Sequence, residues 1–135
     1  MLECLPVEEE EDELKDVKII LVHGSYPYTF ETGYLCTVYP SLYCDVSEFV
    51  PLVPLGMGKG LADLFDLCPL NKIMYGSDGA AAPEIYWFAA NVFRRKLTFP
   101  LQDIMAQGMV HENYALTVAE VILSGTAADI YRFSL

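Results

Sequence analysis

The sequence predicts an α/β fold with a small parallel β-sheet. Three short apolar runs, rich in β-branched side chains, follow one another at intervals of about 25–30 residues. Segments with apolar residues at helical spacing separate these runs. The resulting order of strand, helix, strand, helix, strand is typical of repeated right-handed βαβ units.

The three predicted strands differ in their apolar pattern. Residues 17–22 form an almost continuous apolar run, which suits a strand buried on both faces of a parallel sheet. Residues 42–47 alternate between two faces, and one of these faces carries only apolar side chains. Residues 72–76 form the third run and lead into a segment of small residues. Three parallel strands are too few to close a barrel, so the sheet has two unprotected edges.

The predicted helices fill the intervals between the strands and the rest of the chain. Residues 30–39 and 58–68 are the first two, each followed by a proline. After the third strand, Pro83 suits a helix start, and the bases at 94–96 favour the end of that helix. Two or three further helices are expected, over 101–107, 111–123 and 127–133. Each is expected to pack on the sheet.

Composition excludes several classes of protein. Of 135 residues, 53% are hydrophobic and only 20% are charged, which excludes a disordered segment. Much of the net charge of −11 comes from the first 16 residues, so we expect an acidic, solvated segment over 1–16 and one domain over 17–135. A basic surface that would hold nucleic-acid phosphates is not expected.

The same sequence predicts a cytoplasmic protein. No apolar run reaches the roughly 18 residues of a membrane-spanning helix, and the acidic amino end does not resemble a secretion signal. The cysteines Cys4, Cys36, Cys44 and Cys68 form no Cys-x-x-Cys pair. We expect buried thiols, with a metal or redox role as the less favoured alternative.

Functional groups of parallel α/β folds collect after the carboxyl ends of the strands. His23 follows the first strand and could ligate a metal or serve as a hydrogen-bonded structural residue. Asp45 ends the second strand, and we favour a structural hydrogen bond to the backbone or to Ser47. Asp78 follows the third strand between small residues, where it could bind a metal and accept a proton, or form an ordinary turn.

Two other segments are set aside. Residues 111–113, His-Glu-Asn, are interpreted as a helix start rather than as metal ligands. The glycine-rich residues 56–60 follow no strand and lack the spacing of a phosphate-binding loop.

Taken in order, four motifs resemble the amidohydrolase-related family of metal-dependent hydrolases. They are KIILVHGSYPY at 18–28, YCDVS at 43–47, KIMYGSDG at 72–79, and the Pro-Glu pair at 83–84. The chain looks most like the amidohydrolase-like domain that plants and fungi fuse to a glutamine-synthetase-like domain. That family has a (β/α)8 barrel, so the resemblance implies a partial barrel: the sixth to eighth strands and the closing helices.

The resemblance also implies roles for residues. His23 matches a histidine at the metal centre, where it ligates the metal or polarises a carbonyl. Asp78 matches an acid that ligates the metal and acts as the catalytic base toward the hydrolytic water. Ser25, Tyr26 and Ser77 would lie around the same mouth as substrate contacts. The implied cofactor is a divalent metal, with zinc favoured over manganese or iron, and the substrate is a small molecule with a C–N or C–C bond near a carboxylate or amide.

The sequence departs from the family in its metal ligands. His23 and His111 are its two histidines, so it has no His-x-His pair, and ligands expected from the fourth and fifth strands are also absent. Hydrolytic zinc usually has three protein ligands, so we expect this chain to be inactive on its own.

Three hypotheses follow from this incomplete ligand set. The chain is the carboxyl-terminal portion of a hydrolase, or a truncated paralogue that acts as a non-catalytic binding or regulatory module. In the third hypothesis it is a half-barrel that another chain or a second copy completes, since its apolar strand edges require a partner. Neither nucleic acid nor a membrane is an expected partner.

Overall fold

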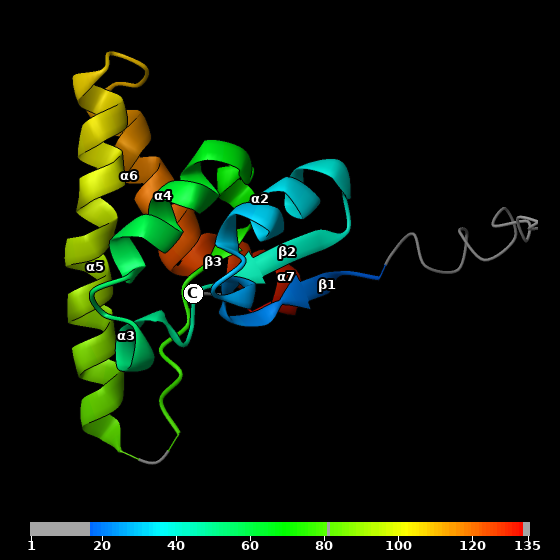
Figure 1. Ribbon diagram of the computed structural model, residues 1–135, viewed down its shortest axis with the longest axis vertical. Coiled ribbons are helices and arrows are strands. Elements are labelled where there is room, and N and C mark those ends of the chain that lie inside the picture. Colours follow the sequence, from blue (N-terminus) through cyan, green and yellow to red (C-terminus); the bar gives the residue numbers. More distant parts are fainter. Residues whose placement is uncertain (1–16, 81, 134–135) are drawn as a thin grey trace, which may run out of the picture.

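A computed structural model describes residues 17–80 and 82–133 of the chain. The predicted acidic segment 1–16 lies outside the described residues. The strands are β1 (Ile19–Leu21), β2 (Leu42–Asp45) and β3 (Ile73–Met74). They form a parallel sheet in the order β1-β2-β3 (Figure 1). The α/β class and the parallel order of the strands are therefore confirmed.

The register of the sheet aligns the ends of all three strands. Leu21 pairs with Cys44 on β2, and Cys44 pairs in turn with Ile73 on β3. Because all three strands run in the same direction, their carboxyl ends lie along one edge. The loops that follow them therefore start close together.

The first strand is shorter and more exposed than predicted. Of the run at 17–22, only Ile19–Leu21 is a strand, and the 3-10 helix η1 (Val22–Ser25) follows at once. Ile19 is 50% exposed, so the expectation of burial on both faces is wrong here. The reason is that β1 lies at the edge of this sheet, where the described residues cover it incompletely.

Two predicted helices cover one side of the sheet. Helix α2 (Thr29–Val38) packs against helix α4 (Met57–Leu67), and both begin within one residue of their predicted starts. Figure 1 shows the two helices side by side above β2. Their inner faces are buried at helical spacing, with Thr32 and Cys36 on α2 and Leu61 and Leu64 on α4.

The next helix does not end where the sequence predicts. Helix α5 (Pro83–Ala106) continues through the basic residues 94–96 and includes Pro100 and the helix expected at 101–107. The reason is a stripe of buried side chains at every fourth position: Ala89, Phe93, Leu97 and Leu101. The free energy gained by burying this stripe is larger than the cost of the hydrogen bond lost at Pro100. It is also larger than the preference of basic side chains for the carboxyl end of a helix.

The last two predicted helices are joined. Helix α6 (Glu112–Glu120) runs through a π-helical turn, η3 (Val121–Gly125), into α7 (Thr126–Tyr131). The expected separation between 111–123 and 127–133 is therefore wrong, because the π turn continues the backbone hydrogen bonding. The short helices α3 (Phe49–Leu52) and η2 (Leu70–Lys72) were not predicted.

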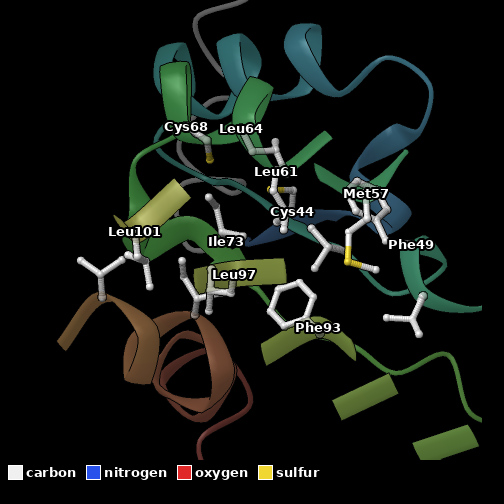
Figure 2. Packing of buried hydrophobic residues seen from close by; sticks show 14 of the residues in the cluster. Cys44, Phe49, Met57, Leu61, Leu64, Cys68, Ile73, Phe93, Leu97 and Leu101 are labelled. Atoms are coloured by element: carbon white, nitrogen blue, oxygen red, sulfur yellow. The ribbon is translucent and has the colours of Figure 1, made fainter. Parts of the chain in front are cut away.

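The core lies between the sheet, α4 and α5. Figure 2 shows Phe93 and Leu97 of α5 facing Ile73 of β3, with Leu61 and Leu64 of α4 nearby. Cys36, Cys44 and Cys68 are buried free thiols, as predicted, whereas Cys4 lies outside the described residues. Within 17–80 and 82–133, no helix is both long and apolar enough to cross a membrane.

Candidate functional site

His23 lies in a tight left-handed turn after β1. His23, Gly24 and Ser25 have φ angles of 61°, 55° and 51°. Gly24 is required here for space as well as for its φ, because a Cβ at this position would lie 3.2 Å from Cζ of Phe49. The turn holds the half-buried His23 side chain at the carboxyl edge of the sheet.

Three side chains form a hydrogen-bonded chain at this edge. Nδ1 of His23 lies 2.6 Å from Oγ of Ser47, and that hydroxyl donates to Oδ1 of Asp45 over 2.6 Å. The same carboxylate oxygen accepts the backbone N–H groups of His23 at 2.9 Å and Ser47 at 3.0 Å. Asp45 therefore fixes both the backbone of the first loop and the hydroxyl of the second.

This chain of hydrogen bonds favours one tautomer of His23. An ionised carboxylate only accepts, so the single hydroxyl proton of Ser47 goes to Asp45. The Ser47 oxygen must then accept a proton from Nδ1 of His23. The backbone N–H of Glu48 also points at Nδ1, but over 3.4 Å this contact is much weaker than the 2.6 Å contact with Ser47. Nε2 of the neutral ring consequently keeps its lone pair, which is the state that binds a metal.

The loop that follows β3 packs closely against the loop that follows β2. A Cβ on Gly76 would lie 2.9 Å from Cβ of Ser47, so only glycine allows this approach. Beyond Gly76, the hydroxyl of Ser77 accepts the backbone N–H of Gly79 at 3.3 Å. Asp78 stands between them with an exposed side chain and a φ of 51°. The structure therefore holds the start of this loop against the Ser47 that partners His23.

The other two predicted substrate contacts lie at the first loop. Ser25 is half-buried, and its carbonyl accepts the backbone N–H of Tyr28 at 2.9 Å. The Tyr26 ring meets Phe49 edge-on at a centroid distance of 5.9 Å. Tyr26 also lines a cavity of about 150 Å3 beside the start of α4. Its ring thus extends from the His23 turn towards α4.

An ion pair stands across this small cavity. The Lys59 ammonium lies 2.6 Å from Oδ2 of Asp63, which also accepts the Thr29 hydroxyl at 2.7 Å. Burial raises the pKa of Asp63, but the hydrogen bonds from Lys59 and Thr29 outweigh burial, and the net shift is downwards. The same pairing raises the pKa of Lys59.

The residues that suit a metal are few at the carboxyl edge. His23 offers a neutral imidazole nitrogen and Asp78 an exposed carboxylate, both donor types that divalent zinc accepts. Within the described part of the chain, however, neither belongs to a group of three close metal-binding side chains. These two donors are fewer than the three that hydrolytic zinc usually takes. They fit the metal in kind but do not complete its coordination.

Sequence reasoning found part of this arrangement. The structural hydrogen bonds of Asp45 to Ser47 are as predicted, but the link from Ser47 to His23 was missed. Its signal was the placement of Asp45 and Ser47 two residues apart, on one side of the strand end. Residues 111–113 do start a helix, α6, and residues 56–60 start α4.

Comparisons with known proteins agree on a family. A model of the family described as "Amidohydrolase" matches residues 12–133. The chain is 32% identical over 120 residues to "Protein fluG" of Emericella nidulans, and the match covers 88% of this chain but 14% of that protein. A crystal structure from Lactobacillus casei, described as a metal-dependent hydrolase, is 31% identical with a TM-score of 0.75. The match covers 87% of this chain and 30% of that one.

Proposed function

Because this chain belongs to the amidohydrolase family, we propose that it supplies the carboxyl-terminal part of a metal-dependent hydrolase site. One observation carries the proposal: the Asp45–Ser47–His23 chain engages Nδ1, while Nε2 of His23, at the carboxyl edge of the sheet, has no hydrogen-bond partner within 17–80 and 82–133. A histidine whose other ring nitrogen is held by a polar partner is the usual form of a histidine ligand.

The fold supports a partial (β/α)8 barrel. This chain has three parallel strands joined by helical crossovers, and its match to a longer metal-dependent hydrolase covers 87% of its length. Ile19 on β1 and Trp87 on α5 are 50% and 71% exposed. Exposed apolar side chains of this size support the proposal that further elements pack against the sheet and the helices. The remaining strands would pair with the free edges of β1 and β3.

Each residue has a defined task in this proposal. His23 and Asp78 would hold a divalent cation, with zinc favoured because imidazole and carboxylate suit it. A cation held there lowers the pKa of water towards neutrality. The Asp78 carboxylate would accept a proton from the attacking water and would return that proton to the leaving group. Ser25, Tyr26 and Ser77 would contact the substrate.

The substrate class follows from the same assignment. We propose hydrolysis of a C–N or C–C bond beside a carboxylate or amide in a small molecule. Since two donors do not complete a zinc site, the other ligands would come from preceding strands of a longer polypeptide or from a complementing chain. The competing proposal, a non-catalytic binding module, predicts that neither metal nor hydrolysis depends on His23 or Asp78.

A chimeric barrel tests the proposal. This chain would replace the matching 30% of the Lactobacillus casei protein, and bound zinc would be measured together with hydrolysis of a panel of small amides and carboxylates. We expect Asp78→Asn and His23→Ala to lower bound zinc and to reduce hydrolysis by more than about a hundredfold. Asp66→Asn and His111→Ala are the matched controls and should change neither. A folded chimera that keeps its zinc and its turnover without Asp78 would contradict the assignment.

The transcript upstream of Met1 distinguishes the remaining hypotheses. An in-frame His-x-His segment on a predicted strand would identify a portion of one hydrolase chain. A stop codon without such a segment would favour the binding module or the complemented half-barrel. Those two differ in association: the module should stay monomeric, and the half-barrel should form a stable complex.

A further inference from the structure

Three cysteines from three different elements meet in the core. Cys36 lies on the inner face of α2, Cys44 on β2, and Cys68 directly after α4. Their sulfur atoms all lie within 4.8 Å of one another, and all three are free thiols. Figure 2 shows Cys44 and Cys68 within the packed core beside Leu61 and Leu64.

We propose that Cys36, Cys44 and Cys68 form a three-thiolate binding site for a soft d10 metal ion, with copper(I) as its best occupant. Three sulfur ligands, each about 2.3 Å from one ion in their common plane, lie about 4 Å apart. The separations in the structure are within 4.8 Å, so small side-chain rotations close the site. The ligands come from α2, from β2 and from the residue that directly follows α4, and these elements hold them in place.

The choice of ion follows from the donors. Thiolates are soft ligands that select copper(I) and zinc over harder cations. Structural zinc is almost always four-coordinate, and within residues 17–80 and 82–133 no histidine, carboxylate or fourth cysteine joins this group. Copper(I) accepts three sulfur ligands without a fourth donor. The shielded position also favours it, because Cys36 and Cys44 are 0% exposed and Cys68 is 4% exposed.

Charge around the cluster supports a thiolate. The Lys72 ammonium donates to the carbonyl oxygens of Cys36 at 2.7 Å and Tyr39 at 2.8 Å, which places a fixed positive charge at the cluster. Hydrogen bonds from the Cys44 and Cys68 thiols, together with Lys72, lower the pKa of Cys36 to about 4. The Lys72 charge and these hydrogen bonds thus favour the thiolate form of Cys36.

The other two sulfurs are harder to ionise than Cys36. The hydrogen bond to Cys36 raises the pKa of Cys68 to about 12 and raises that of Cys44 as well. The Cys68 sulfur also lies 3.5 Å from the carbonyl oxygen of Pro69, which is a second acceptor within reach of its proton. Binding of one copper(I) ion would form three copper–sulfur bonds and release the two remaining thiol protons to solvent, with no change in oxidation state.

This site is separate from the carboxyl edge. Its ligands lie between β2 and the helices α2 and α4, whereas His23 and Asp78 follow the ends of β1 and β3. Copper at the cysteines would therefore not depend on His23. All three ligands of the copper site come from elements of this chain, so the site needs no residue from a partner.

Competition with a chromophoric copper(I) chelator under reducing conditions tests the proposal on the full chain. We expect one copper(I) per chain, and more than about tenfold weaker binding in Cys36→Ala, Cys44→Ala and Cys68→Ala. Cys4→Ala is the matched control and should bind as the wild type does. Binding that survives in all three variants, or that is lost in Cys4→Ala alone, would overturn the proposal.

X-ray absorption of the wild-type copper complex needs no variant and so remains informative if a core substitution prevents folding. Three sulfur neighbours around copper are expected. Two sulfurs, or nitrogen and oxygen neighbours, would overturn the three-thiolate site. A parallel titration with zinc alone tests the ion preference: zinc binding tighter than copper(I) would overturn the assignment of copper.

Discussion

Oγ of Ser47 lies 2.6 Å from Nδ1 of His23, across the gap between the loops that follow two neighbouring strands. Because the Ser47 hydroxyl donates its hydrogen bond to Asp45, its oxygen favours a protonated Nδ1 and holds the orientation of the His23 ring. The residue that directs the imidazole is thus a serine 24 positions away in sequence.

The first prediction concerns this tautomer. At about pH 8, where an ordinary imidazole is neutral, nitrogen-15 spectra should show Nδ1 of His23 protonated and Nε2 unprotonated. Ser47→Ala removes the acceptor at Nδ1, so the Nε2-protonated tautomer should gain population. His111 is exposed and serves as the internal control in the same spectra. An unprotonated Nδ1 in the wild type would contradict the assigned direction of the hydrogen bonds.

The second prediction concerns the contact between the second and third loops. Gly76→Ala places a Cβ 2.9 Å from Cβ and 3.3 Å from Cα of Ser47, and the backbone Cα cannot easily move away. We expect the free energy of unfolding to fall by about 1–3 kcal/mol. Urea unfolding followed by circular dichroism measures this change.

Gly58→Ala is the matched control for Gly76→Ala. A Cβ at Gly58 meets nothing within 4 Å, and the residue lies in α4, where alanine is the better helix former. This substitution should therefore leave stability unchanged or raise it by up to about 1 kcal/mol. Equal losses in the two variants would contradict the close approach at Ser47.

The parallel sheet was predictable because its signal is local. The run at 17–22 and the run at 42–47 each show a strand pattern on their own, and the helices between them impose a parallel order. The end of α5 was not predictable in the same way. The bases at 94–96 indicate a helix end, but Leu97 and Leu101 are buried by partners distant in sequence and extend the helix.

The candidate sites depend on contacts that sequence spacing does not encode. His23 contacts Ser47 because Leu21 of β1 pairs with Cys44 of β2, which brings the loops after these two strands together. A shift of one residue in this register would separate the two side chains. The cysteines show the same limit: Cys36, Cys44 and Cys68 have no metal-binding spacing, yet the fold brings their sulfurs within 4.8 Å. The burial of the three thiols was predicted from the sequence, but their clustering was not.

The third prediction concerns the pH dependence of stability. The folded-state pKa of Asp63 lies below its ordinary value, so its ionised form stabilises the fold above that ordinary value. This contribution is lost as the pH falls through the lower folded-state pKa. Asp63→Asn should therefore melt at a lower temperature than the wild type near neutral pH, and the difference should shrink below about pH 4.

The matched control for Asp63→Asn is Asp66→Asn, which changes an exposed carboxylate on the same helix. Its melting temperature should follow the wild type across the whole pH range. Lys59→Ala should lower the melting temperature by less than Asp63→Asn does, since the Lys59 side chain is largely exposed and surface ion pairs contribute little. A pH-independent gap between the wild type and Asp63→Asn would exclude the ionised carboxylate as the stabilising group.

The last prediction concerns Tyr75, which follows β3 and is joined by its backbone N–H to the carbonyl of Ile122 at 2.8 Å. Its ring packs on Phe93 at a centroid distance of 4.9 Å. The phenol oxygen is buried and has no hydrogen-bond partner among the described residues. A buried polar group without a partner costs about 1–3 kcal/mol. Burial also raises the pKa of this phenol.

Tyr75→Phe removes this oxygen and keeps both the ring contact and the backbone hydrogen bond. The free energy of unfolding should therefore stay the same or rise by about 1 kcal/mol, whereas most core substitutions lower it. Urea unfolding of Tyr75→Phe beside Tyr86→Phe, whose ring is half-exposed, measures the difference. A loss of more than about 1 kcal/mol in Tyr75→Phe alone would show that the hydroxyl has a partner in the folded protein, because an oxygen without one cannot stabilise the fold.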